Sequence, residues 1–456
     1  MTILSLDLGT TTITGVLWGG QPARVLRLAR RRNDAGIQAG SPLRAEQDPQ
    51  RLEALAREVL AELAARAEAG DPPQALALTG QMHGLLCADA AGEPLGPLIT
   101  WQDRRTAEPP NADAPSGGAT AMDRLQARLA DLDWRANGCR IRHGYGAATL
   151  FWLSSHDALP PGTRWVSPLA GWLAGRLVGQ APAIDPSFAA SWGLYDLRPG
   201  RWNEAFLDRL EIDRRLLPGV RPTAEPVGRL LPAVARRTGL PAGLPVLNPV
   251  GDNQAAYLGS TWMPGAAGQP GTPTPAILVN LGTGGQVGWA VPAWQPPGEA
   301  VETRPLPLPG GDGAGTGFLR VGASLCGGAA WAWLERTVRA WLAEFGLEID
   351  AETAYGRLND LAAACADTQG LRVRTTFLGA RDDPGVEGGA IEGITLDNLS
   401  LGALARATLA GMVDELYRLY AAHGGPQAGA DHVVAAGGAV ERNPLLLELI
   451  EERFRT

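Results

Sequence analysis

The sequence predicts an α/β protein made of two related domains with a cleft between them. Residues 3–12 and 276–285 each read as an apolar strand that runs into Leu-Gly-Thr. The length of 456 residues exceeds what a single hydrophobic core normally supports. In each half, a long amphipathic helix and a strand ending in glycine follow later, so the architecture repeats while the sequence does not.

The first helix is predicted over residues 48–70. Asp48 is a suitable N-cap and Pro49 suits the first turn. Apolar positions at helical spacing form one stripe, made of Leu52, Leu55, Ala56, Val59, Leu60 and Leu63. The apolar residues 75–78 that follow are predicted to form a strand, which ends at a Thr-Gly-Gln sequence.

The second half repeats this plan. A helix is predicted over residues 400–424, with an inward stripe of Leu401, Leu404, Ala405, Leu409, Met412, Val413 and Leu416. A strand over residues 432–435 follows and ends at Ala-Gly-Gly. Residues 240–245 read as a linker, so the predicted domains are residues 1–245 and 246–456. Stretches rich in Pro, Gly and Ala are expected to be surface loops: 109–118, 264–275 and 292–317.

The two Leu-Gly-Thr turns favour polyphosphate binding. A strand that ends in glycine and threonine can turn tightly, aim successive backbone N–H groups at one point and add hydroxyl donors. Two such turns facing each other would make a clamp for ATP. The chain contains no lysine, so all 40 Lys and Arg residues are arginine. This excludes a Walker A loop, a protein kinase and pyridoxal-phosphate chemistry.

Composition argues against nucleic-acid and membrane partners. The formal net charge is −8, and the one concentrated basic run, residues 30–32, is short and isolated. The apolar N-terminal stretch is broken by Asp7, and no run approaches the roughly 20 apolar residues of a membrane span. The four cysteines lack metal-ligand spacing, so zinc is not expected. We expect a cytoplasmic protein with reduced thiols.

Asp7 lies at the end of the first predicted strand, and Asp252 lies directly after a later one. Asp7 precedes the first turn, where a carboxylate can hold Mg²⁺ against phosphates; the alternative is an Asx turn. A carboxylate is costly to bury without a partner, which favours the metal. Asp252 follows the apolar residues 246–250 and begins a helix. It could accept a proton from a hydroxyl that attacks the γ-phosphate, or it could simply cap the helix.

Residues 81–84 and 101–105 carry groups that suit a polyol. The first lies at the carboxyl end of a predicted strand, where ligands of α/β sheets usually bind. His83 could donate to sugar hydroxyls and Met82 could form an apolar wall; the alternative is a turn histidine and a core methionine. Trp101 offers an aromatic plane beside polar groups, or else is a buried tryptophan next to a surface ion pair.

A third glycine segment lies near the end of the chain. Gly437 and Gly438 would let the backbone approach a flat ring closely, and Asn443 with Pro444 is predicted to cap the following helix. An adenine contact and an ordinary turn stay equally open from this segment alone.

Taken in order, five motifs resemble the signature series of the FGGY carbohydrate kinases: residues 7–11, 79–84, 251–254, 281–284 and 436–438. The resemblance spans nearly the whole chain. It implies the actin-like ATPase (ribonuclease H-like) fold, in which two domains close over MgATP and a sugar. Residues 1–245 would then bind the sugar and residues 246–456 the nucleotide.

The resemblance also implies a role for each motif. Asp252 would be the catalytic base, and Asp7 would serve Mg²⁺. The nucleotide-binding residues would be Gly9, Thr10, Thr11, Gly282, Thr283, Gly284, Gly437, Gly438 and Asn443. The sugar-binding residues would be Gln81, Met82, His83, Trp101, Tyr145, Asp252 and Asn253. The implied partners are a sugar and MgATP, and a homodimer stays open.

Residues 81–84 are similar to the xylulokinase and sedoheptulokinase side of the family, and residues 99–104 with 144–152 are most similar to sedoheptulokinases. The resemblance therefore implies ATP-dependent phosphorylation of the terminal primary hydroxyl of sedoheptulose. The alternatives are D-xylulose as the substrate, or a non-catalytic actin-like module that binds ATP.

Two features depart from the family pattern. Ala380 stands where the family's Gly-Glu-Arg stretch has glutamate, within residues 377–384. The chain also stops at Thr456, inside a helix that begins near Pro444. The last strand and helix of the nucleotide domain are therefore expected to be missing from this sequence.

Overall fold

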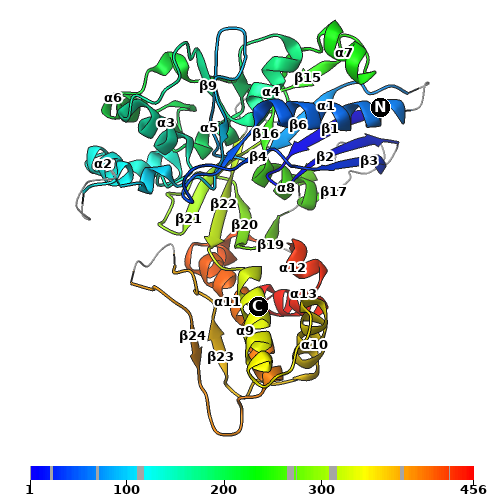
Figure 1. Cartoon of the computed structure of the whole chain (residues 1–456), viewed down its shortest axis with the longest axis vertical. Coiled ribbons are helices and arrows are strands. Elements are labelled where there is room, and N and C mark those ends of the chain that lie inside the picture. Colours follow the sequence, from blue (N-terminus) through cyan, green and yellow to red (C-terminus); the bar gives the residue numbers. More distant parts are fainter. Residues whose placement is uncertain are drawn as a thin grey trace. The chain divides into compact units, whose positions relative to one another are not determined.

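The computed structural model describes residues 2–20, 24–67, 71–109, 118–263, 272–273, 275–307, 316–380, 385–430 and 432–455. Two compact units divide the chain (Figure 1). Unit 1 comprises Met1–Ala256 and Arg304–Thr316, and unit 2 comprises Tyr257–Thr303 and Gly317–Thr456. Parts of the three predicted loops lie outside the described residues, namely 110–117, 264–271 with 274, and 308–315, and so do residues 381–384.

The predicted linker at residues 240–245 is wrong. These residues connect α7 (Pro232–Thr238) to β15 (Pro245–Leu247). Strand β15 pairs with β6 (Leu76–Gly80) in the sheet of unit 1, so the chain is still inside unit 1 at this point. A short connection rich in Pro and Gly here serves as a helix-to-strand turn.

The main sheet of unit 1 has the strand order β14-β15-β6-β1-β2-β3, and β16 also pairs with β6. Its other strands are β1 (Ile3–Leu8), β2 (Thr12–Gly19), β3 (Arg24–Arg32), β14 (Pro226–Arg229) and β16 (Val250–Gly251). Strands β1, β6 and β16 run parallel, with Leu8 and Gly251 both paired to Gly80. The carboxyl ends of these three strands therefore meet at one edge of the sheet.

Helix α1 (Pro49–Ala65) forms as predicted but ends with Arg66 as its C-cap, and residues 68–70 of the predicted helix lie outside the described residues. The Asp48 carboxylate accepts a hydrogen bond from the Gln50 N–H at 2.9 Å, and the predicted apolar stripe is buried. The helix packs on β2 at Gly15, where a Cβ would clash with Val59 and Leu63. Local capping and periodicity thus suffice to define this element.

Three helices lie in the core of unit 1, buried over most of their residues: α3 (Gly146–Ser155), α4 (Leu169–Val178) and α5 (Pro186–Ser191). Helices α2 (Ala121–Arg128) and α6 (Glu204–Leu210) are amphipathic. The small strands are β4 (Gly36–Ile37), β5 (Glu46–Gln47), β7 (Leu86–Ala88), β8 (Leu98–Ile99), β9 (Trp165–Ser167), β10 (Ala183–Ile184), β11 (Tyr195–Asp196), β12 (Arg201–Trp202) and β13 (Gly219–Val220). Among them, β4, β5 and β8 form one antiparallel sheet.

The second large sheet has the order β21-β22-β20-β19-β25 and belongs to unit 2, apart from residues 304–307 of β21 and Thr316 of β22, which are assigned to unit 1. Its strands are β19 (Ala276–Leu281), β20 (Gly285–Val291), β21 (Val301–Pro307), β22 (Thr316–Ser324) and β25 (His432–Ala436). Strand β19 pairs antiparallel with β20 and parallel with β25, as in the predicted strand-turn-strand plan. The prediction of a loop over 292–317 is wrong at β21, because prolines are tolerated in a strand at a sheet edge.

Helix α11 (Leu401–Ala422) forms the core of unit 2 and is capped by Ser400, which accepts from the Ala403 N–H. The predicted stripe is buried except for Leu401, which is 36% exposed. The remaining elements are α8 (Asp252–Thr261), α9 (Gly328–Glu344), α10 (Ala351–Ala364), α12 (Gly438–Glu441), α13 (Pro444–Phe454), β17 (Trp262–Met263), β18 (Thr272–Pro273), β23 (Arg372–Arg374) and β24 (Ala390–Glu392). Within the described ranges, the helices are too short or too polar to cross a membrane.

Candidate active site

Asp7 lies near the carboxyl end of β1. Leu6 and Leu8 on either side are fully buried, and the alternation of a strand places Asp7 on the opposite face. Its Oδ1 atom is buried without a hydrogen-bond partner among the described residues, and burial raises the pKa of the carboxyl. A buried carboxylate oxygen left in this way is available to a cation.

The turn after β1 is held by backbone contacts. The Gly9 N–H donates to the Thr12 carbonyl at 3.1 Å, and a Cβ on Gly9 would lie 2.8 Å from that oxygen. The Asn33 side-chain amide donates to the carbonyls of Gly9 and Thr10. Thr11 is exposed. The turn therefore has a fixed shape and keeps a threonine at the surface.

Asp252 follows β16 and is the first residue of α8. Water reaches its side chain, yet desolvation by the surrounding protein, followed by the charge of Asp7, raises its pKa to about 7. The Asn253 N–H, which donates to Oδ1 at 2.7 Å, and the Arg304 charge act in the opposite direction. A carboxyl with a pKa near neutrality is suited to accept and release a proton at physiological pH.

Gln81 belongs to a buried polar ring. Its Nε2 donates to Gln47 Oε1 at 3.0 Å, and Gln47 Nε2 donates to the Thr10 carbonyl at 3.1 Å. Thr10 Oγ1 lies 3.4 Å from Gln81 Oε1 and donates to it. Met82, next to Gln81, is buried and packs so closely on Gly251 that a Cβ there would lie 2.7 Å from the sulfur. The segments after β1, β6 and β16 are thus in direct contact.

His83 is fixed in an unusual backbone conformation. Its φ is +70°, a region that costs about 1–3 kcal/mol for a residue other than glycine. Its Nδ1 lies 2.6 Å from the Ser191 carbonyl, and its ring stacks on Tyr145 with centroids 4.2 Å apart. His83 does lie in a turn, but both its ring and its backbone are held by neighbouring elements.

Trp101 is 47% exposed, so the alternative of a buried tryptophan is wrong. Its Nε1 donates to Thr10 Oγ1 at 2.9 Å. Behind it, Gly144 has a φ of +78° and packs on the Trp101 backbone so tightly that a Cβ would clash with the carbonyl oxygen. Gly144 thereby brings the chain just before Tyr145 against the backbone of Trp101.

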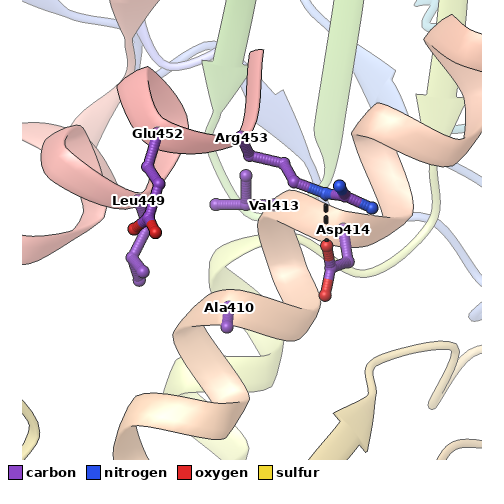
Figure 2. Close-up of a pocket in the computed structure, with 6 residues that line it drawn as sticks. All are labelled: Ala410, Val413, Asp414, Leu449, Glu452 and Arg453. Carbon is purple, nitrogen blue, oxygen red and sulfur yellow. Dashed lines mark hydrogen bonds and ion pairs between the residues drawn. The ribbon is translucent and has the colours of Figure 1, made fainter. Parts of the chain in front are cut away.

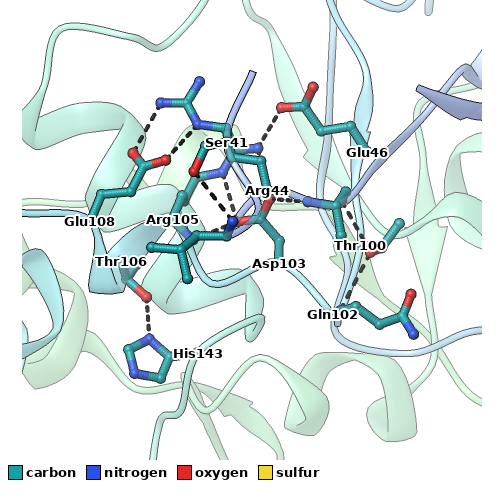
Figure 3. Close-up of polar contacts among 12 residues, drawn as sticks. Ser41, Arg44, Glu46, Thr100, Gln102, Asp103, Arg105, Thr106, Glu108 and His143 are labelled. Carbon is teal, nitrogen blue, oxygen red and sulfur yellow. Dashed lines mark hydrogen bonds and ion pairs between the residues drawn. The ribbon is translucent and has the colours of Figure 1, made fainter. Parts of the chain in front are cut away.

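The other part of that alternative, an ion pair at the surface, is also wrong, because Asp103 and Arg105 are buried. Figure 3 shows the contacts around this pair. Arg105 Nε donates to Asp103 Oδ1 at 2.8 Å, and Arg105 Nη2 donates to Glu46 Oε1 at 2.5 Å. Asp103 Oδ2 also accepts from the Ala45 N–H at 2.9 Å. This network ties the segment that carries Trp101 to β5, which carries Gln47.

A second layer of contacts surrounds this network. The guanidinium groups of Arg44 and Arg105 each lie 5.2 Å from the centre of the Trp152 ring. Arg44 also pairs with Glu108 at 2.7 Å. Sequence reasoning missed Arg44, Glu108 and Gln47. The polar residues Arg44, Glu46 and Gln47 just before α1 were the available signal.

In unit 2, the turn between β19 and β20 contacts the beginning of α9. The Gly328 N–H donates to the Gly282 carbonyl at 2.8 Å, and the Gly327 N–H donates to the Thr283 carbonyl at 3.0 Å. Gly282 and Thr283 are exposed. Sequence reasoning missed Gly327 and Gly328, although two glycines directly before a helix are a recognisable signal.

Gly437 lies against the end of β19. Its φ is +101°, and a Cβ would lie 2.5 Å from the Leu281 carbonyl and 2.7 Å from Asn280 Oδ1. Gly438, the first residue of α12, is exposed. The turn after β19 and the turn after β25 are therefore neighbours within unit 2.

Asn443 precedes α13, but its side chain does not cap the helix, so the predicted cap is wrong in this respect. The side chain is buried and donates from Nδ2 to Asn359 Oδ1 on α10 at 3.0 Å. A partner from another helix has taken the place of the capping interaction.

A shallow pocket in unit 2 lies between α11 and α13 (Figure 2). Arg453 and Asp414 form an ion pair at 2.8 Å beside it. The residues that line it are Ala410, Val413, Asp414, Leu449, Glu452 and Arg453, none of which is a predicted site residue.

Comparisons with known proteins identify the family of this chain. Residues 2–259 match the family model for the N-terminal domain of the FGGY family of carbohydrate kinases. The fold and this match define an ATP-dependent sugar kinase, a phosphotransferase. The chain belongs to the FGGY family of carbohydrate kinases.

Similar relatives include sedoheptulokinases of Mus musculus and Homo sapiens, each 27% identical over 99% of this chain and 92% of theirs. A glycerol kinase of Thermus brockianus is 28% identical over 98% of this chain and 84% of its own. The crystal structure of xylulose kinase from Rhodospirillum rubrum has a TM-score of 0.81 at 24% identity and covers 99% of this chain and 84% of that one. This likeness confirms the predicted fold class.

Proposed function

We propose that this kinase transfers the γ-phosphate of ATP to the terminal primary hydroxyl of sedoheptulose. The observation that carries the proposal is the placement of Asp252 beside Asp7, with sugar-type side chains at the same strand ends of unit 1. The similarity to two sedoheptulokinases over nearly the whole chain supports the choice of sugar. A cytoplasmic location and a homodimer remain predictions.

Asp252 is the proposed catalytic base. Its raised pKa means that the ionised carboxylate is a stronger proton acceptor than an ordinary aspartate. It takes the proton from the sugar hydroxyl as that oxygen attacks the γ-phosphorus and the bond to the β-phosphate oxygen breaks. The proton stays on Asp252 until product release, and ADP leaves with the electron pair of the broken bond.

Asp7 is the residue that would hold Mg²⁺. Its buried Oδ1 lacks a partner among the described residues, and carboxylate oxygens are the ligands that this ion prefers. When bound, Mg²⁺ neutralises charge on the phosphate oxygens. Because Asp252 titrates under the influence of the Asp7 charge, neutralising Asp7 would also lower the pKa of the base.

The sugar is proposed to lie against the carboxyl ends of β6 and β16. His83 and Gln81 supply hydrogen-bonding groups, and Asn253 adds an amide next to the base. Met82 gives an apolar surface, and the rings of Tyr145 and Trp101 are suited to the C–H faces of a polyol. The stacking of His83 on Tyr145 holds both rings before the sugar arrives.

The nucleotide is proposed to bind through backbone and hydroxyl groups, since the chain has no lysine. Taken separately, the turn at residues 9–11 of unit 1 and the turn at residues 282–284 of unit 2 each carry backbone N–H and hydroxyl groups of the kind from which a phosphate oxygen accepts. Gly437 and Gly438 would serve the adenosine, and so would Asn443, whose backbone N–H donates to the Val440 carbonyl of α12 at 3.2 Å.

The test is ADP release with MgATP and sedoheptulose, D-xylulose, D-ribulose or glycerol at equal concentrations. We expect the highest kcat/KM with sedoheptulose. A preference for D-xylulose or for glycerol would be consistent with the proposed mechanism but would contradict sedoheptulose as the substrate. A folded protein that binds ATP but releases no ADP with any of these sugars would support a non-catalytic module instead.

A further inference from the structure

Helix α5 is a short buried helix that carries two buried serines, Ser187 and Ser191. They stand four residues apart, which places them on one face of the helix. Each of them contacts a different segment of the candidate active site. Buried polar groups cost stability unless they form hydrogen bonds, so the partners of these two serines indicate what the serines do.

Ser187 contacts the backbone immediately before Asp252. Its Oγ accepts a hydrogen bond from the Gly251 N–H at 2.8 Å and donates its own proton to Asp185 Oδ1 at 2.5 Å. Because the single hydroxyl hydrogen is given to Asp185, the lone pairs of Oγ are directed at the amide. The peptide that leads into Asp252 is thus held by an oriented acceptor.

Asp185 is itself fixed from several sides. It is fully buried and caps α5 by accepting the Phe188 N–H at Oδ1, while Oδ2 accepts from Thr223 Oγ1 at 2.6 Å. Burial raises the pKa of this carboxyl to about 6, although its hydrogen bonds act in the opposite direction. The carboxylate therefore orients the Ser187 hydroxyl, and the oxygen that does so, Oδ1, is held by the Phe188 N–H independently of Thr223, which bonds to Oδ2.

Ser191, at the other end of the same face, holds His83. Its Oγ accepts from the His83 N–H at 3.3 Å, and its carbonyl contacts the imidazole Nδ1 at 2.6 Å. One rigid helix thus supports both the segment of the proposed base and the histidine of the proposed sugar site.

We propose that Ser187 is a positioning residue for Asp252, acting through the Gly251 amide. This inference rests on the proposed role of Asp252 as the base. Gly251 has no side chain to pack, and Met82 leaves no room for one, so the peptide is held by the pairing of β16 with β6 and by the hydrogen bond from the Gly251 N–H to Ser187. Misplacing a catalytic group by about 1 Å can cost about 100-fold in rate.

The experiment compares Ser187→Ala and Ser187→Cys with wild type under steady-state conditions with MgATP and the preferred sugar. Both variants remove the strong acceptor, and cysteine keeps nearly the same volume, so it decides the matter if the alanine variant does not fold. We expect kcat to fall about 10- to 100-fold while KM for the sugar changes less than about threefold. Ser187→Thr, which keeps the hydroxyl, should restore most of kcat.

The matched control is Thr223→Val. It removes the other hydroxyl bonded to Asp185 and leaves the bond from Gly251 to Ser187 in place, so it should lower stability with little change in kcat. Normal kcat in a folded Ser187→Cys, or an equal loss in Thr223→Val, would overturn the positioning role. If Asp252→Asn is also nearly normal, the proposed base fails; if that variant is inactive, only this inference fails.

Discussion

The indole Nε1 of Trp101 donates a hydrogen bond to the hydroxyl of Thr10 at 2.9 Å. This bond joins the segment after β8 to the turn after β1. Thr10 is also linked to Gln81, directly and through Gln47. Trp101 and Gln81, two of the side chains proposed for the sugar, therefore share one hydrogen-bond network with the turn proposed for the phosphates.

Replacing Trp101 with phenylalanine keeps an aromatic ring and removes this hydrogen bond. A lost hydrogen bond of about 0.5–1.5 kcal/mol corresponds to roughly a two- to tenfold change. We expect KM to rise in this range for both the sugar and MgATP, measured by initial rates. Trp341→Phe, at an exposed position on α9, is the control and should change neither value. An unchanged KM for MgATP in the Trp101 variant would contradict the link to Thr10.

Gly144 and Gly162 offer a matched pair of glycine substitutions. Both have φ near +80°, but a Cβ on Gly144 would clash with the Trp101 carbonyl, whereas a Cβ on Gly162 meets nothing within 4 Å. Gly162→Ala should cost only the backbone strain, about 1 kcal/mol, and leave the kinetics unchanged. Gly144→Ala should cost more, by urea unfolding, and raise KM for the sugar. Equal effects would show that the close approach at Trp101 is unimportant.

Two ion pairs of the same spacing differ in burial. Arg105–Asp103 is buried, whereas Arg215–Asp213 is exposed. Arg105→Met would leave Asp103 buried without its cation and should destabilise unit 1 by about 3–5 kcal/mol. Arg215→Met should cost less than about 1 kcal/mol. Thermal unfolding of both variants checks this, and similar shifts in Tm would argue against the burial of the Arg105 network.

The raised pKa of Asp252 predicts a pH dependence of stability. Between its ordinary value of 3.8 and about 7, the native state binds more protons at this site than the unfolded state. The contribution of Asp252 to stability therefore falls as the pH rises through this window. Asp252→Asn should be more stable than wild type at pH 8, and the difference should shrink toward pH 4 in urea unfolding.

The control for this pH dependence is Asp213→Asn. A hydrogen bond from Arg215 lowers the pKa of Asp213, so this carboxylate stabilises the native state at neutral pH. Its substitution should therefore have the opposite sign. A stability difference for Asp252→Asn that is independent of pH, or reversed, would contradict the raised pKa.

The elements with strong local signals could be predicted from the sequence. Asp48 with its apolar stripe defines α1, and Ser400 with its stripe defines α11. Asp7, Gln81 and Asp252 were placed at or just after strand ends, and parallel pairing of β1, β6 and β16 brings them together. Because the carboxyl ends of parallel strands lie at one edge of a sheet, the position of each residue at a strand end was enough to predict that these residues lie close together.

The supporting contacts could not be predicted in the same way. Asp103–Arg105 and Asp213–Arg215 have the same spacing, yet only the fold buries the first pair. Gln47 reaches Gln81 and Ser187 reaches Gly251 across 34 and 64 positions. Such contacts depend on how separate elements pack, and they cannot be predicted from hydrophobic periodicity or from helix-capping residues.

The most direct test of the account is the turnover of Asp252→Asn with MgATP and the preferred sugar, measured beside ADP binding by calorimetry. We predict a loss of kcat of at least about 100-fold with ADP affinity nearly unchanged, because the amide cannot accept the proton while the nucleotide turns are untouched. Turnover within about threefold of wild type would contradict the account and remove Asp252 as the base.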